Sequence, residues 1–220
     1  LQRYSLLCGN NASSGGALHA TDNSTVLASS SITLVSNSAL EGTAGAMLVD
    51  ATARLMVSGQ VLDMLHNSAA SDGAVLHVMD SGQADVSTQG ASCSCNVAGG
   101  SGGCFSAAGQ GRLSLSNDLS LNAVHNRAGQ GGVLSLGGGS VSEIQANLRF
   151  TSNSADVAGG AVCLSGSAVL RLHPSSSLLV EDNVAAEGGG VSAIGSSKLV
   201  LHDGVNLVVA NNSADVSGGG

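Results

Sequence analysis

A short glycine motif recurs along the whole chain at a nearly constant interval. Each copy holds a small residue followed by a glycine, and the intervals between these second glycines are 29, 28, 30, 29, 28, 29 and 30 residues. A stable period of this length is typical of solenoids, in which each repeat packs only against its neighbours. Residues 1–220 are therefore predicted to form one repeat region of about seven coils, a section of a longer array. The copies are Gly15-Gly16-Ala17, Ala44-Gly45-Ala46, Asp72-Gly73-Ala74, Gly102-Gly103-Cys104, Gly131-Gly132-Val133, Gly159-Gly160-Ala161, Gly188-Gly189-Gly190 and Gly218-Gly219-Gly220.

Three segments between successive motifs alternate apolar residues with other residues. This period of two is the pattern of a strand with one buried face. Helical repeats are the alternative, but the alternation and the many glycines disfavour them. The pattern predicts an all-β, parallel β-helix with three short strands per coil, and the general crossover preference makes it right-handed. The inward pairs of the first strand are expected to be Leu18/Ala20, Met47/Val49, Val75/His77, Phe105/Ala107, Leu134/Leu136, Val162/Leu164 and Val191/Ala193.

An asparagine lies a few residues before each glycine motif. Asparagine tolerates left-handed backbone and forms local hydrogen bonds through its amide, so it suits a corner between strands. Amides that stack from coil to coil can also hydrogen-bond as a ladder. The predicted structural column is Asn11, Asn37, Asn67, Asn96, Asn126, Asn153, Asn183 and Asn212.

Composition and charge narrow the classes of partner. The chain has 32 Gly, one Tyr, two Phe and no Trp, so its core must be built from Val, Leu, Ile and Ala in thin layers. A net charge of −8 disfavours nucleic acid and anionic membrane surfaces. No apolar run approaches the roughly 18 residues of a membrane span. The expected partners are flanking coils of the same protein, host or matrix proteins, or glycans.

One pair of motifs resembles a known family. Phe150-Thr151-Ser152-Asn153 followed by Gly159-Gly160-Ala161-Val162 is similar to the F-x-x-N and G-G-A-[ILV] motifs of chlamydial-type polymorphic outer-membrane protein repeats. The asparagine and the glycine motif extend this resemblance over nearly the whole chain, whereas the phenylalanine occurs once. The resemblance implies a right-handed β-helix in the exposed part of a cell-surface or secreted protein, often with a role in adhesion. Elsewhere the phenylalanine position holds Cys8, Leu34, Met64, Cys93, Ala123, Val180 and Val209.

The five cysteines suggest two different roles. Cys8 and Cys93 share the column of Phe150 and are expected to be small buried hydrophobes. Cys95 and Cys104 flank a glycine-rich corner. A disulfide between them would close that corner and fit an oxidising compartment, and two free thiols are the alternative. A metal site formed by Cys93, Cys95 and Cys104 lacks a fourth ligand.

Three aspartates, Asp22, Asp50 and Asp80, fall at nearly the same phase of successive coils. They could form a ladder that binds a cation. Later coils hold glycine at this corner, and aspartate and glycine share the ability to serve a tight turn. The turn interpretation is therefore preferred. The corresponding glycines are Gly109, Gly137, Gly166 and Gly195.

Two further patterns concern the surface. His173 and His202 share a phase one coil apart and are expected to stack on the outside rather than bind a metal. Asn11, Asn23 and Asn211 match the N-glycosylation acceptor pattern, which is compatible with a secreted context.

The outward residues of the first strand offer no pair of acids. Hydrolysis or elimination on a polysaccharide requires carboxylates, or a base with an arginine, that converge on one face. No catalytic, cofactor-binding or metal-binding residues are therefore predicted. The expected function is a non-catalytic structural or adhesive scaffold. The alternative is a carbohydrate-binding or polysaccharide-processing β-helix whose active residues lie outside this stretch. The expected outward column is His19, Leu48, Leu76, Ser106, Ser135, Cys163 and Ser192.

Overall fold

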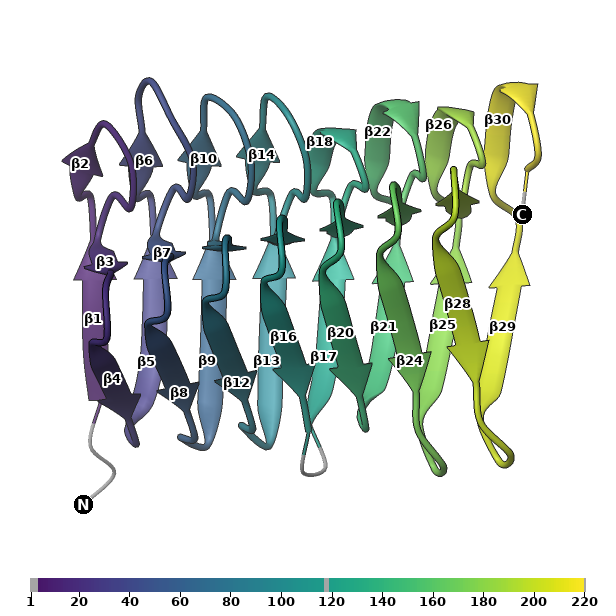
Figure 1. The fold of residues 1–220 in the computed structure, drawn as a ribbon. Coiled ribbons are helices and arrows are strands. Elements are labelled where there is room, and N and C mark those ends of the chain that lie inside the picture. Colours follow the sequence, from purple (N-terminus) through teal and green to yellow (C-terminus); the bar gives the residue numbers. More distant parts are fainter. Residues whose placement is uncertain (1–3, 117–118, 220) are drawn as a thin grey trace.

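The computed structural model describes residues 4–116 and 119–219 (Figure 1). The chain winds as a parallel β-solenoid of about seven coils, about 29 residues apart, and the described residues contain no helix. Every strand pairs in parallel with the equivalent strand of the next coil, which is the pairing expected when each coil runs in the same direction. The predicted all-β parallel solenoid is confirmed.

Two sheets of eight strands, named A and B here, follow each other along every coil. Sheet A consists of β1 (Tyr4–Cys8), β5 (Ser31–Val35), β9 (Val61–Leu65), β13 (Gly90–Ser94), β17 (Ser120–Val124), β21 (Asn147–Thr151), β25 (Ser177–Glu181) and β29 (Asn206–Ala210). Sheet B consists of β2 (Asn11–Ala12), β6 (Ser38–Ala39), β10 (Ser68–Ala69), β14 (Val97–Ala98), β18 (Arg127–Gln130), β22 (Ser154–Ala158), β26 (Val184–Glu187) and β30 (Ser213–Ser217). The short strands of sheet B are additional to the three per coil that the alternation predicts.

Two sheets of seven strands, C and D, complete each coil. Sheet C consists of β3 (Leu18–Ala20), β7 (Met47–Val49), β11 (Leu76–Val78), β15 (Phe105–Ala107), β19 (Leu134–Leu136), β23 (Val162–Leu164) and β27 (Val191–Ala193). Sheet D consists of β4 (Thr25–Ala28), β8 (Arg54–Val57), β12 (Gln83–Val86), β16 (Arg112–Leu115), β20 (Val141–Ile144), β24 (Val169–Leu172) and β28 (Lys198–Leu201). In Figure 1 sheet D lies in front of sheet A, and sheet B forms the upper edge.

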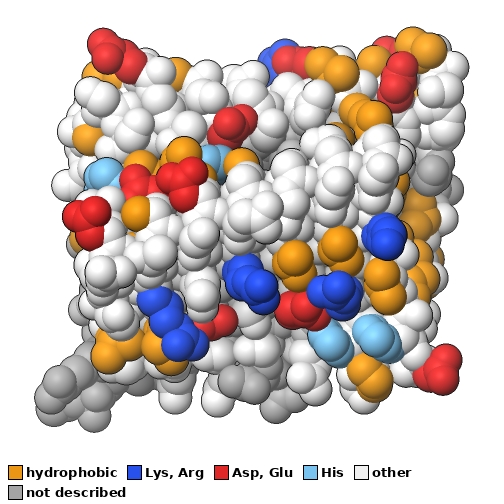
Figure 2. Space-filling model, in the orientation of Figure 1, with side chains coloured by type: hydrophobic (Ala, Val, Ile, Leu, Met, Phe, Trp, Pro, Cys, Tyr) orange, Lys and Arg blue, Asp and Glu red, His pale blue; other side chains and the backbone are white. Residues whose placement is uncertain are grey.

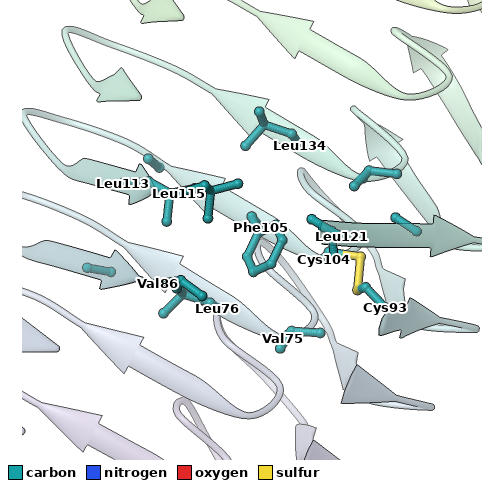
Figure 3. Close-up of a cluster of buried hydrophobic side chains, with 14 of the residues drawn as sticks. Val75, Leu76, Val86, Cys93, Cys104, Phe105, Leu113, Leu115, Leu121 and Leu134 are labelled. Carbon is teal, nitrogen blue, oxygen red and sulfur yellow. A yellow bond between two sulfur atoms is a disulfide. The ribbon is translucent and has the colours of Figure 1, made fainter. Parts of the chain in front are cut away.

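The core lies between sheets A, C and D and is a single continuous cluster of mainly aliphatic side chains. Figure 3 shows Leu113 and Leu115 of sheet D, Leu121 of sheet A and Phe105 of sheet C pointing into the same interior. Each coil supplies one thin layer, so small and branched residues fill the space that aromatics fill in a globular core. A cavity of about 670 Å³ lies in this same interior at the first two coils, lined by Leu7, Leu18, Val26, Ile32, Met47 and Leu55.

A ladder of buried asparagines runs along the corner between sheets A and B. In each step the backbone N–H and the side-chain amide of one asparagine donate to Oδ1 of the asparagine in the next coil, as Asn96 donates to Asn126 at 3.1 and 3.0 Å. The same amide also donates to a backbone carbonyl of the preceding coil, here that of Met64. Both hydrogen atoms of the amide are therefore used.

The ladder begins at Asn10, so the prediction of Asn11 is wrong. Asn10 donates from its backbone and its side chain to Oδ1 of Asn37, whereas Asn11 is exposed and pairs with Ser38 in sheet B. The residue before each ladder asparagine has a left-handed backbone, and Gly9 takes that position with a φ of 67°. The other seven predicted asparagines lie in the ladder.

The predicted register of the third coil is wrong by one residue. The backbone N–H of Gly45 bonds to Gly73, and that of Ala74 bonds to Gly102, so the motif there is Gly73-Ala74 and its second residue is alanine. Leu76, not Val75, pairs with Met47 in sheet C. His77 consequently faces away from the core, where Leu76 was expected.

Candidate functional site

The outer face of sheet D carries a polar hollow that crosses three strands. A depression of about 240 Å³ is lined by Gln83, Asp85, Arg112, Ser114, Val141 and Glu143, with Leu113 at its floor. A second depression of about 170 Å³ adjoins it, because Ser114 and Glu143 line both. Its other polar lining residues are Ser116, Gln145 and His173. We call the two depressions together the sheet D groove.

The register of the sheet explains why the surface is hollow here. Asp85, Ser114 and Glu143 are direct neighbours on β12, β16 and β20 and point outward in one row. The serine side chain is the shortest of the three, so it leaves a gap between two longer carboxylates. Sequence reasoning that follows only one coil cannot find this row, because its members are separated by 29 residues.

Both carboxylates of the groove are held by basic partners. Arg54 donates to Oδ2 of Asp85 at 2.8 Å. Arg171 and His173 donate to the two oxygens of Glu143 at 2.8 and 2.6 Å. Partial burial raises the pKa of Glu143, but the hydrogen bonds from His173 and Arg171 outweigh it and hold the pKa below its usual value. Glu143 is therefore an ionised acceptor near neutral pH rather than a proton donor.

Basic residues are concentrated on this face of an acidic chain. Four of the seven Lys and Arg residues point outward from sheet D, against two acids, Asp85 and Glu143. Figure 2 shows the Lys and Arg side chains as a band over the sheet D strands, with histidines at one end. Among the described residues neither Arg112 nor Lys198 has an acidic partner. The four basic residues are Arg54, Arg112, Arg171 and Lys198.

The predicted surface stack of His173 and His202 is confirmed. Their ring centroids are 5.0 Å apart and the rings are within 10° of parallel. In the part of the chain that the structure describes, no three His, Cys, Asp or Glu side chains gather closely enough to hold a metal ion.

The three aspartates at the corner between sheets C and D do not form one column. Asp22 and Asp80 have left-handed backbone, with φ of 58° and 56°, and Ala51 takes that position in the coil between them. Asp50 lies one residue earlier, and its carboxylate bonds to His19 at 2.8 Å. The turn interpretation therefore fits Asp22 and Asp80, and the grouping with Asp50 is wrong.

The disulfide joins Cys93 to Cys104, so the predicted pairing of Cys95 with Cys104 is wrong. Both bonded cysteines are fully buried, and Figure 3 shows their bond inside the core. Cys95 has left-handed backbone at the corner before the ladder and keeps a free, half-buried thiol. Cys8 is exposed rather than buried, because Leu7 occupies the core column at that coil.

From β7 to β23 the outward residues of sheet C are buried, contrary to expectation, whereas His19 on β3 is exposed and Ser192 on β27 is half-buried. The glycine motif folds back over them, and a Cβ on Gly102 would lie only 3.0 Å from Cβ of Ser106. Beneath this cover His77 is 2% exposed and Cys163 is fully buried. Burial raises the pKa of the Cys163 thiol to about 11, so it stays protonated and unreactive at neutral pH.

The sequence carries a signal for sheet B that the three-strand prediction does not use. Every ladder asparagine is followed two residues later by alanine, the inner residue of a sheet B strand. Three alanines, Ala74, Ala98 and Ala128, form a separate small apolar cluster. An N-x-A pattern at the period of the glycine motif identifies the fourth sheet.

His77 is expected to make the fold sensitive to mild acid. Burial lowers its pKa, the charges of Asp72 and Asp80 offset this only in part, and its Nδ1 has no partner among the described residues. The folded state therefore binds the proton more weakly than the unfolded state. Stability is complete above the unfolded value of 6.5 and decreases as the pH falls from there towards the lowered pKa.

Thermal unfolding of His77→Ser should test this between pH 7.5 and 5.5. Serine occupies the same position in the next two coils, as Ser106 and Ser135. The variant should lose much less Tm over this range than the parent protein. His125→Ser, which changes an exposed histidine, is the matched control and should behave like the parent. An unchanged pH dependence in His77→Ser would contradict the assignment.

The three asparagines of the glycosylation pattern, Asn11, Asn23 and Asn211, are all exposed. Among the described residues, no helix has the length and hydropathy that a membrane crossing needs. Comparisons with protein-family models, with curated proteins and with solved structures find no match.

Proposed function

We propose that this chain is a non-catalytic β-helical scaffold of a cell-surface or secreted protein, with a structural or adhesive role. The observation that carries the proposal is the continuity of the sheets and of the asparagine ladder from coil to coil. The sheets and the asparagine ladder pass through all the described coils without interruption, so each coil is held by its neighbours on every side. A rod of this kind keeps the features of its outer surface at a constant spacing, which suits it to display binding sites.

Two observations support an extracellular location. A buried disulfide, Cys93–Cys104, is typical of proteins that fold in an oxidising compartment. The resemblance of the asparagine and glycine motifs to polymorphic outer-membrane protein repeats points to an exposed position in the same way. We therefore propose the surface of the cell, or the surrounding medium, as the place where the scaffold acts.

Labelling of intact and permeabilised cells tests the location. Antibodies against the native repeat region should label intact cells or detect the protein in the medium, and the protein recovered there should yield a peptide linking Cys93 to Cys104. A cytosolic marker that is detected only after permeabilisation is the control. A signal that also requires permeabilisation, together with free thiols at both positions, would refute the proposal.

A further inference from the structure

We propose that the sheet D groove binds an acidic oligosaccharide, a chain of carboxylated or sulfated sugars that lies across β12, β16 and β20. This inference rests on the proposed function, because it assigns a ligand class to a surface that the scaffold displays. It follows from the shape of the groove, from its neutral polar groups and carboxylates, and from its unpaired arginine.

The groove is suited to a polyol. Gln83, Gln145 and Ser114 offer both hydrogen-bond donors and acceptors, and they alternate with the carboxylates of Asp85 and Glu143. Hydroxyl groups donate to carboxylates, and an acidic sugar carries hydroxyl groups beside each of its acidic groups, whereas an Asp or Glu side chain has no donor to offer when it is ionised. The carboxylates therefore favour a hydroxyl-rich ligand over an acidic peptide.

The positive charge of the face selects an acidic sugar. Arg112 lines the groove and is exposed, with no acidic partner among the described residues. Its planar guanidinium can bind a carboxylate or a sulfate through two parallel hydrogen bonds. Arg54 lies in the same outward row, two strands away, at roughly 10 Å by strand spacing. A linear ligand along the solenoid axis would thus meet basic groups at intervals set by the strands.

Binding without cleavage follows from the ion pairs. Asp85 and Glu143 stand two strands apart, roughly 10 Å between Cα atoms, and they point outward in one row, as a pair of carboxyl groups does across the sugar in inverting glycosidases. Such an enzyme needs one carboxyl group to be protonated as the general acid. Arg171 and His173 keep Glu143 ionised, and the carboxylate of Asp85 is engaged in an ion pair with Arg54, so neither group is placed to donate that proton to a bound sugar.

Calorimetric titration of the full-length protein at physiological salt provides the test. The probes are tetragalacturonate, a heparin-derived tetrasaccharide and, as the neutral control, maltotetraose. At least one acidic probe should bind, and the neutral one should not. Arg112→Gln should weaken that binding tenfold or more. The matched control is Arg127→Gln, which removes an exposed arginine of sheet B that pairs with Asp156, and it should leave the affinity unchanged.

A second variant tests the shape of the site. Ser114→Gln fills the gap between the two carboxylates without changing the charge, and it should also reduce binding at least tenfold while the thermal unfolding curve stays that of the parent. Binding of the uronate alone or of the sulfated probe alone would identify the acidic group.

Three results would overturn the assignment: no binding of either acidic probe, equal weakening by Arg112→Gln and Arg127→Gln, or release of shorter oligosaccharides from a bound probe. The first two leave the scaffold proposal intact if surface labelling succeeds, so the two proposals can fail separately.

Discussion

Replacing Asn126 with alanine is expected to destabilise the protein by on the order of 5 kcal/mol, because several buried groups lose their partners at once. Asn126 is 1% exposed. Its Oδ1 accepts from the backbone and the side chain of Asn96, and its amide donates to the carbonyl of Cys93 and to Oδ1 of Asn153. Each buried group left unsatisfied costs about 1–3 kcal/mol, a large part of the stability of an ordinary domain.

Chemical denaturation monitored by circular dichroism measures this loss. Asn122→Ala is the matched control, because Asn122 is exposed on β17 and should contribute less than about 0.5 kcal/mol. Asn126→Asp has nearly the same shape but lacks the amide hydrogens, so it should be almost as destabilising as the alanine variant. A stability close to that of the parent in both Asn126 variants would show that the ladder contributes little.

Phe150→Ala is expected to cost about 3–5 kcal/mol through the cavity that it leaves. Phe150 is 1% exposed and shares its column with Cys93 and Ala123 of the two preceding coils. Since Cys93 is bonded to Cys104, the residues equivalent to this pair face each other in every coil. Phe150 therefore faces Ala161, as Ala123 faces Val133 one coil earlier.

Because Phe150 faces Ala161, a larger residue at position 161 should restore part of the stability that Phe150→Ala loses. Adding Ala161→Val to Phe150→Ala reproduces the Ala123 and Val133 pair and should recover roughly 1 kcal/mol, the transfer free energy of one or two buried methylenes. The single variant Ala161→Val should instead be destabilising, because it overpacks a layer that holds phenylalanine. Val157→Ala, at an exposed position, is the control for the loss of a side chain outside the core. Strictly additive effects of the two substitutions would contradict the facing arrangement.

Two predictions from the sequence, that of Asn11 in the ladder and that of His77 in the core, are wrong by one residue. Asn10 and Asn11 are adjacent and chemically identical, and Asn10 enters the ladder because Gly9 before it has the left-handed backbone and Ala12 two residues after it is the inner residue of β2. The predicted inward position of His77 is wrong because Ala74 replaces the usual glycine of the motif. In both cases the pattern within one coil allows two registers, and the pairing with the neighbouring coil selects one.

The cysteine pairing and the groove were beyond prediction for a related reason. Cys95 and Cys104 are closer in sequence, but Cys93 is the one whose side chain points into the core opposite Cys104. The groove depends on Asp85, Ser114 and Glu143 standing side by side, and their spacing in the sequence is meaningful only once the strand register is known.

The period of the glycine motif and the alternation of apolar residues determined the solenoid and its number of coils from sequence alone, because each coil repeats one local pattern that can bury its apolar face only against its neighbours. The tertiary structure decided which side chains meet. Coils differ in length by a residue or two, and a shift of one residue moves a side chain to the opposite face of its strand. The ladder, the disulfide and the groove all consist of contacts between residues that such shifts bring together or separate.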